Sequence, residues 1–329
     1  MSIPTAGEVS HERAPRAGII LLLAALCQTA CAARGAPPRS DRAPAPAPAT
    51  VTASPETEPA PGTKAEPAAV SIGDSLVRED ELAYRGYTVR KYYRDVRAPD
   101  APGGRAEVAY AALERGGKAV RSFDAGVYSG FGNSAGFGLF PFLGGGEKQL
   151  VVSQDAPRAG AQWVVSLSPR PRVIYDGPAF GAGREADDVL VEDLDGDGAY
   201  EILAPVCAFY GFRDWALDPA GTPLPPAVFK YDAKAGKYLP ANRLFRARLL
   251  KDVEAAKSKV RGPGAPGPHL SDVLSVVLTY VYAGDERAAW EFYDAAYGLP
   301  DKAAVKRDVK GVLRAEPVYR FLYKPAARR

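Results

Sequence analysis

Alternating apolar and polar positions predict a series of short β-strands between residues 86 and 239. Most of these segments come in pairs that are joined by turns rich in Gly or Pro, a pattern typical of hairpins. Because the connections are too short for parallel crossovers, we expect antiparallel pairing. The predicted strands span residues 86–93, 106–113, 118–123, 148–153, 163–167, 172–175, 188–192, 201–204, 228–231 and 236–239.

The periodicity becomes helical after the Pro- and Gly-rich segment 262–268. A first helix is predicted by an apolar stripe, and two more by possible N-cap residues, Asp285 before 286–297 and Asp301 before the last helix. The stripes of the first and third helices consist of Leu270, Val273, Leu274, Val277 and Val281, and of Val305, Val309, Val312 and Leu313. The sequence therefore predicts the α+β class, with an antiparallel β region over 73–261 and a helical segment over 262–329.

The first thirty residues have the layout of an export signal. Arg13 and Arg16 precede an apolar run, 18–26, that is shorter than the roughly twenty residues needed to span a membrane. Small residues and Cys31 follow. The segment resembles a bacterial lipoprotein signal, which implies a signal peptide over 1–30, lipidation of Cys31 and, from Ala32, an outer-membrane location.

Two other interpretations of the N-terminus stay open. Ala30 and Ala32 also suit the ordinary signal peptidase, which would leave a periplasmic or secreted protein, and the apolar run could remain as an uncleaved anchor. Cys27 is the less suitable lipidation site because bulky Leu26 precedes it.

A stretch rich in Ala and Pro follows, with no aromatic residue between 32 and 69. Alternate prolines over 44–48 lack an N–H and have a fixed φ, so they fit neither a helix nor a sheet. We expect residues 31–72 to form a disordered tether between membrane and folded domain. A binding motif for a partner is the alternative.

Composition excludes several function classes. The chain has 42 basic and 39 acidic residues, a formal charge of +3, which argues against a nucleic-acid-binding surface. Its two histidines, His11 and His269, exclude sites built from several histidines, and its three cysteines cannot form a disulfide framework.

The segment from Asp193 to Glu201 carries the sharpest chemical signal. Asp193, Asp195 and Asp197 alternate with other residues, and Gly196 and Gly198 permit the chain to curl between them. Ca²⁺ binds six to eight oxygens, so we expect these carboxylates, the Ala199 carbonyl and the Glu201 carboxylate to be its ligands. A metal-free Asp-Gly turn is the alternative. A bound ion would be structural, since no base marks a catalytic site.

An EF-hand is excluded by spacing, because position twelve of such a loop would be Ala204 and not Glu. The segment instead resembles the FG-GAP repeat of integrin-like β-propellers. Phe180-Gly181 precedes the loop, and Glu201-Ile-Leu-Ala-Pro205 follows it. The resemblance covers a single repeat and implies a calcium loop in a propeller-blade-like meander.

Weaker signals favour structural roles. We expect the Gly-rich segment 130–138 to be a flexible loop, and Cys207 to be a small buried group and not a nucleophile paired with His269. The acidic residues Asp187, Asp188 and Glu192 suggest a solvated strand edge or outer-shell charge near the calcium loop, with paired carboxylates for glycoside cleavage as the alternative. An aromatic group after the loop is expected in the core, with a ligand-binding face as the alternative: Phe209, Tyr210, Phe212 and Trp215.

Together these features predict a lipid-anchored cell-envelope protein of binding or structural type, with Ca²⁺ as a structural ion and no enzymatic activity. Its expected partners are the membrane, through the lipid, and a protein or glycan ligand, with no nucleic acid. The alternative is an envelope hydrolase that acts on glycans or peptides.

Overall fold

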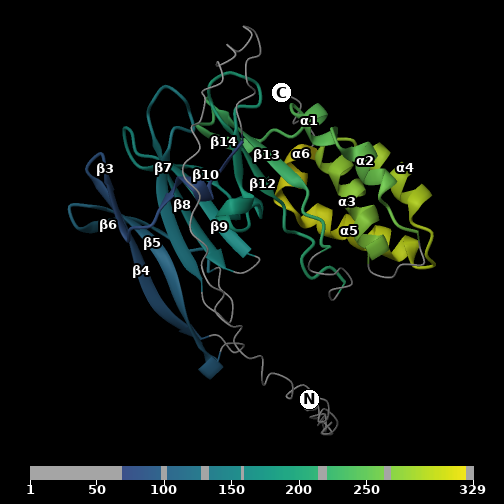
Figure 1. Ribbon diagram of the computed structural model, residues 1–329, viewed down its shortest axis with the longest axis horizontal. Helices are drawn as coiled ribbons and strands as arrows, with labels where there is room; N and C mark the ends of the chain where they lie inside the picture. The colour runs from purple at the N-terminus through teal and green to yellow at the C-terminus, as the bar shows by residue number, and fades with distance from the viewer. Residues whose placement is uncertain are drawn as a thin grey trace, which may run out of the picture. The chain divides into compact units, whose positions relative to one another are not determined.

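The computed structural model describes residues 69–97, 102–126, 133–156, 159–213, 221–262 and 268–323, all within one compact unit, Gly62–Arg329. These residues form three antiparallel sheets followed by helices (Figure 1), which confirms the α+β class and the C-terminal position of the helices. The signal peptide, Cys31 and nearly all of the predicted tether lie outside the described residues.

The first sheet is a four-stranded meander in which neighbouring strands pair in chain order. Its two long strands pair along their length, for example Val89 with Leu113. Gly116 and Gly117 both have left-handed φ angles in the turn before the last strand, as the sequence pattern predicted for a hairpin. The strands are β3 (Glu81–Tyr84), β4 (Tyr87–Arg97), β5 (Arg105–Arg115) and β6 (Lys118–Phe123).

The second sheet has the order β10-β9-β8-β7-β2. Its strands are β2 (Leu76–Val77), β7 (Ser134–Phe140), β8 (Gln149–Ala156), β9 (Ala159–Ser166) and β10 (Arg172–Asp176). The prediction of a flexible loop over 130–138 is wrong from Ser134 onward, because these residues belong to β7. Gly138 pairs with Leu76 of β2, and the chain just before β2 lies so close that a Cβ on Gly138 would be 1.8 Å from the Ser75 carbonyl oxygen, which explains the glycine at this position.

The third sheet has the order β1-β11-β12-β13-β14. Its strands are β1 (Val70–Ser71), β11 (Leu190–Glu192), β12 (Glu201–Pro205), β13 (Pro226–Asp232) and β14 (Lys237–Pro240). Val70 pairs with Val191, so the sheet begins inside the last three residues of the predicted tether. Ile72 directly follows β1 and is buried in the core that the third sheet shares with the second sheet and the helices.

The second sheet is the middle layer of the three. Val151 and Val164 join a buried cluster with the third sheet and the helices, whereas Val152 and Val165 join another with the first sheet. Successive side chains of a strand point to opposite faces. The order of layers is therefore first sheet, second sheet, third sheet and helices (Figure 1).

The helices begin earlier than predicted, since α1 and α2 lie before residue 262. They follow β14 after a short turn, in a segment where the sequence shows no clear apolar stripe. The helices are α1 (Arg246–Leu250), α2 (Val253–Ser258), α3 (Pro268–Tyr282), α4 (Glu286–Ala296), α5 (Lys302–Ala315) and α6 (Pro317–Tyr323), and short 3-10 turns are η1 (Gly73–Ser75), η2 (Pro102–Gly104), η3 (Pro178–Phe180) and η4 (Ala186–Asp188).

The apolar stripe predicted for α3 is buried along its length. Asp285 caps α4 by accepting a hydrogen bond from the Ala288 N–H at 3.2 Å. Asp301 stands before α5 but caps no backbone N–H, because its carboxylate accepts from Arg213 at 2.8 Å instead. The predicted helices are thus present, and one of the two predicted caps is replaced by an ion pair.

Candidate functional site

The Asp-Gly loop connects β11 to β12 at the tip of a hairpin. Gly196 and Gly198 have φ angles of +73° and +86°, so both need the left-handed conformation that glycine tolerates. The two oxygens of Asp193 accept hydrogen bonds from the Gly196 N–H at 2.9 Å and the Gly198 N–H at 3.1 Å. As a result, one carboxylate oxygen each from Asp193, Asp195 and Asp197 lies within 4.8 Å of the others.

Lys230 of β13 lies against the same carboxylates. Its ammonium is 2.9 Å from Asp195, 2.7 Å from Asp197 and 2.9 Å from Glu201. Glu201 is only 1% exposed, and its other oxygen accepts from the Leu194 N–H at 2.8 Å. The loop therefore has an internal positive charge at three of the four carboxylates that the sequence predicted as ligands.

The pKa values of this cluster follow from burial and from Lys230. The hydrogen bond from Lys230 lowers the pKa of Asp197, with help from the Ala199 N–H. Burial raises the pKa of Glu201 by more than Lys230 and the Leu194 N–H lower it. Burial lowers the pKa of Lys230, but its three carboxylate partners raise it by more, so the ammonium stays charged at neutral pH.

The donor set fits a hard cation such as Ca²⁺. Carboxylate oxygens are the ligands that Ca²⁺ prefers, and three of them already converge. Asp193, Asp195 and Asp197 would hold the ion, with the Ala199 carbonyl and Glu201 as the further predicted ligands. Lys230 was missed by sequence analysis, although a lysine among apolar neighbours in the predicted strand 228–231 was a visible signal.

The flanks of the FG-GAP-like segment lie together in the structure. Phe180 packs on Phe229 at 5.2 Å between ring centroids, and Gly181 caps η3 with a left-handed φ of +59°. The Gly183 N–H donates to the Pro205 carbonyl at 2.9 Å. The Phe-Gly and Ala-Pro ends are thus adjacent in the fold.

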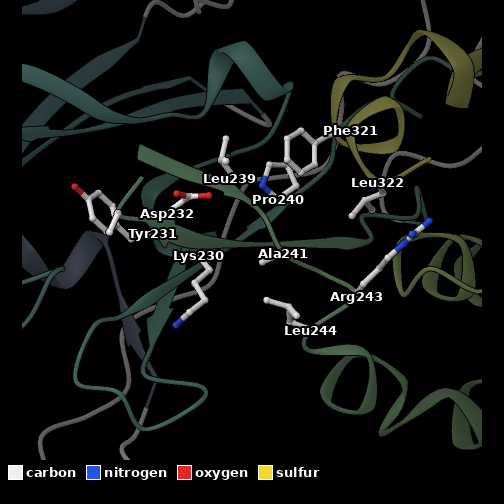
Figure 2. A pocket seen from close by; sticks show the side chains of 11 residues that line it. Lys230, Tyr231, Asp232, Leu239, Pro240, Ala241, Arg243, Leu244, Phe321 and Leu322 are labelled. Carbon is white, nitrogen blue, oxygen red and sulfur yellow. The ribbon is translucent and has the colours of Figure 1, made fainter. Parts of the chain in front are cut away.

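An open apolar groove of about 470 Å³ lies beside the loop, between β13, β14 and α6. Figure 2 shows Phe321 and Leu322 of α6 across from Leu239 and Pro240 of β14. Leu244, at 75% exposure, is the most exposed large apolar side chain among the described residues. The groove is apolar along most of its wall, and polar side chains do not converge at one point of it (Figure 2).

Cys207 and His269, the candidate nucleophile and base, both contact backbone carbonyls of the fold. The Cys207 thiol donates to the Gly183 carbonyl at 3.4 Å, and burial raises its pKa to about 11, so the reactive thiolate is scarce. The His269 ring contacts the Arg261 carbonyl at 2.5 Å and stacks on Tyr297. Cys207 and His269 thus bond to different segments and do not form a nucleophile–base pair.

Ion pairs or burial in the core explain several of the acidic and aromatic residues that the sequence singled out. Asp187 and Asp188 are exposed, and Asp188 pairs with Arg184 at 3.4 Å. The prediction of a solvated edge is wrong for Glu192, which is buried and pairs with Arg248 at 3.3 Å. Phe209 and Phe212 are buried in the core. Trp215, like Cys31, lies outside the described residues.

The comparisons with known proteins add no relative. The chain matches no family model, and neither curated proteins nor solved structures gave a match. In the part of the chain that the structure describes, every helix is too short or too polar to cross a membrane.

Proposed function

We propose that this chain is a lipid-anchored cell-envelope protein of binding or structural type, in which the Asp-Gly loop holds Ca²⁺ as a structural ion. The observation that carries the proposal is the convergence of Asp193, Asp195 and Asp197 within 4.8 Å at a hairpin tip. Such crowding of negative charge is unfavourable unless cations compensate it, and Lys230 supplies one positive charge against four carboxylates. Anchoring through Cys31 rests on the resemblance of the N-terminus to lipoprotein signals.

The ion would act as a clip between β11 and β12. Asp193 follows directly on β11, and Glu201 is the first residue of β12, so a cation bound to both would tie the two strands together. The loop residues are fixed by backbone N–H groups and the sheet, a surrounding that favours a structural ion. Catalytic metal sites keep an open position next to a base.

The groove beside the loop supports binding over hydrolysis. A hydrolase that acts on glycans or peptides needs an acid–base pair or an activated nucleophile at one point of a cleft. The groove has an apolar wall with the charged residues Lys230, Asp232 and Arg243 spread along it. This favours a surface for a protein or glycan ligand, and a non-enzymatic role.

We further propose that the three sheets are propeller-blade-like. Three consecutive meanders of four strands, β3–β6, β7–β10 and β11–β14, each have the topology of a propeller blade. Closed propellers have four to eight blades. In this chain the helices cover the third meander, where a closed propeller would have its next blade.

Thermal unfolding in Ca²⁺ and in chelator tests the calcium proposal. At a hundredfold excess over Kd, binding to the folded state adds about 2.7 kcal/mol, which raises Tm by roughly 5–10 °C for a domain of this size. Mg²⁺ should raise Tm less, because it gives up water reluctantly and demands a tighter shell. Equal melting of wild type in Ca²⁺ and chelator would contradict the proposal.

A substitution in the loop tests whether the rise of Tm in Ca²⁺ comes from binding at the Asp-Gly loop. Asp195→Ala should remove the Ca²⁺ response. Asp176→Ala is the matched control, since Asp176 also accepts a backbone N–H, from Ala179 at 3.3 Å, but lies outside the loop. The control should keep the full response.

A further inference from the structure

Lys230 has a defined place in the third sheet. The register that pairs Ile202 with Phe229 places Lys230 directly opposite Glu201 on the neighbouring strand. The Lys230 side chain is 23% exposed, so its ammonium is partly shielded from water. It is thus a cation held by the sheet and directed at the loop.

We propose that Lys230 is the built-in counter-ion of the Asp-Gly loop, and that a divalent cation binds there only by displacing its ammonium. This inference rests on the proposed calcium function. The ammonium and the metal would use the same carboxylates, Asp195, Asp197 and Glu201. Two cations that share these oxygens would stand only a few ångströms apart and repel each other.

Because Ca²⁺ must displace the Lys230 ammonium, it binds more weakly than it would to the carboxylates alone. The free energy of metal binding is reduced by the cost of breaking three charge-assisted hydrogen bonds, each of which contributes more than a neutral bond. The flexible four-carbon stem of lysine permits the ammonium to move away without a change in the strand. Lys230 therefore sets the calcium concentration at which the loop fills, and it neutralises part of the loop when calcium is absent.

The test compares Ca²⁺ affinity by calorimetry in wild type, Lys230→Met and Lys234→Met. Removal of the competing ammonium should tighten Ca²⁺ binding by about tenfold or more in Lys230→Met. Lys234, an exposed lysine in the turn after β13, is the matched control for loss of one positive charge from the same hairpin. Its variant should change Kd by less than about twofold, because exposed charges are screened.

A second measurement uses the wild-type chain and therefore does not depend on correct folding of the Lys230→Met variant. The NMR signal of the Lys230 Nζ, slowed in proton exchange by its carboxylate partners, should disappear on addition of Ca²⁺ and persist in chelator. Equal Kd in wild type and Lys230→Met, with an unchanged Nζ signal, would overturn the inference and leave the calcium proposal intact. Binding by Lys230→Met alone would support the inference and overturn calcium binding by the wild type. No binding by either would overturn both.

Discussion

At the scale of single residues, Asp155, Glu201 and Glu316 are buried or half-buried carboxylates that accept hydrogen bonds from nearby donors. Asp155 accepts from the Ser153 hydroxyl at 2.8 Å, the Ala186 N–H at 3.1 Å and the Gln162 amide at 3.3 Å. Burial nevertheless raises its pKa to about 6, since these donors lower it by less. Glu201 and Glu316 show the same direction for the same cause. Such groups make stability depend on pH.

Asp155→Asn should therefore change the pH dependence of stability. The folded state binds the Asp155 proton more tightly than the unfolded chain, where aspartate titrates near pH 4. The stabilisation is full below about pH 4 and is lost as pH rises through about 6. Relative to Asp155→Asn, wild type should lose up to about 3 kcal/mol of unfolding free energy between pH 4 and 7. Urea unfolding across this pH range measures the difference.

Asp124→Asn provides a control of opposite sign. Burial raises the pKa of Asp124, but the Gly126 N–H, Gln154 and Arg94 together lower it by more. Its stabilisation is therefore present above about pH 4 and lost as the pH falls further. A wild type that stays parallel to Asp155→Asn between pH 4 and 7 would contradict the assignment for Asp155.

At the scale of elements, the Asp-Gly loop rests on the turn between β7 and β8. The Tyr200 N–H donates to the Phe142 carbonyl at 2.8 Å, and the Tyr238 hydroxyl donates to the Tyr200 carbonyl at 2.9 Å. A Cβ on Gly144 would lie 2.3 Å from the Gly198 carbonyl oxygen. The loop is thus positioned by a turn of a different sheet, about fifty residues earlier in the chain.

A comparison of Gly144→Ala with Gly145→Ala should separate the cost of the clash with the Gly198 carbonyl from the cost of backbone strain. Gly144 and Gly145 both have left-handed φ angles, +68° and +65°, but only Gly144 has atoms within 4 Å of the added Cβ. We expect Gly145→Ala to cost about 1–2 kcal/mol of unfolding free energy, from φ alone. Gly144→Ala should cost about 1–3 kcal/mol more, because the clash displaces the loop backbone. Denaturant unfolding of both variants measures the difference.

The same pair tests whether the turn supports the metal loop. Gly144→Ala should weaken the rise of Tm in Ca²⁺, and Gly145→Ala should leave it unchanged. Equal costs and equal Ca²⁺ responses for the two variants would show that the turn and the loop are independent.

At the scale of the whole molecule, the first strand that the structure describes, β1, follows the Ala- and Pro-rich segment. Val70 and Ser71 pair with β11, the strand that leads into the Asp-Gly loop. A lipid on Cys31 would hold the domain at a membrane surface, since each buried CH₂ contributes about 0.8 kcal/mol and several chains give stable anchoring.

Cys31→Ser should abolish incorporation of radiolabelled fatty acid in cells, and the protein should leave the membrane fraction. Cys27→Ser is the control and should still be labelled. Labelling that persists in Cys31→Ser and disappears in Cys27→Ser would move the site to Cys27. Absence of label in wild type would favour the ordinary signal peptidase or an uncleaved anchor.

The sequence by itself determined the features that are encoded within about ten residues. Turn residues and alternation located both strands of each predicted hairpin. The 3.6-residue period located α3 and α5, and the N-cap residue Asp285 located α4. The three aspartates converge because Gly196 between them and Gly198 after them permit the curl, so this part of the candidate site was also local. Strand β7 was missed because its glycines hide the alternation, and β1, β2, α1, α2 and α6 because they are too short for a clear pattern.

Only the tertiary structure decided which of these segments meet. The pairing of β12 with β13 spans more than twenty residues, and it places Lys230 opposite Glu201. The groove joins β13 and β14 to α6, some eighty residues away, and the turn at Gly144 reaches the loop from another sheet. No local pattern encodes these neighbours, because which faces pack together depends on the burial of whole sheet and helix surfaces. The sequence therefore predicted an acidic loop, and the fold supplied the lysine that compensates part of its charge.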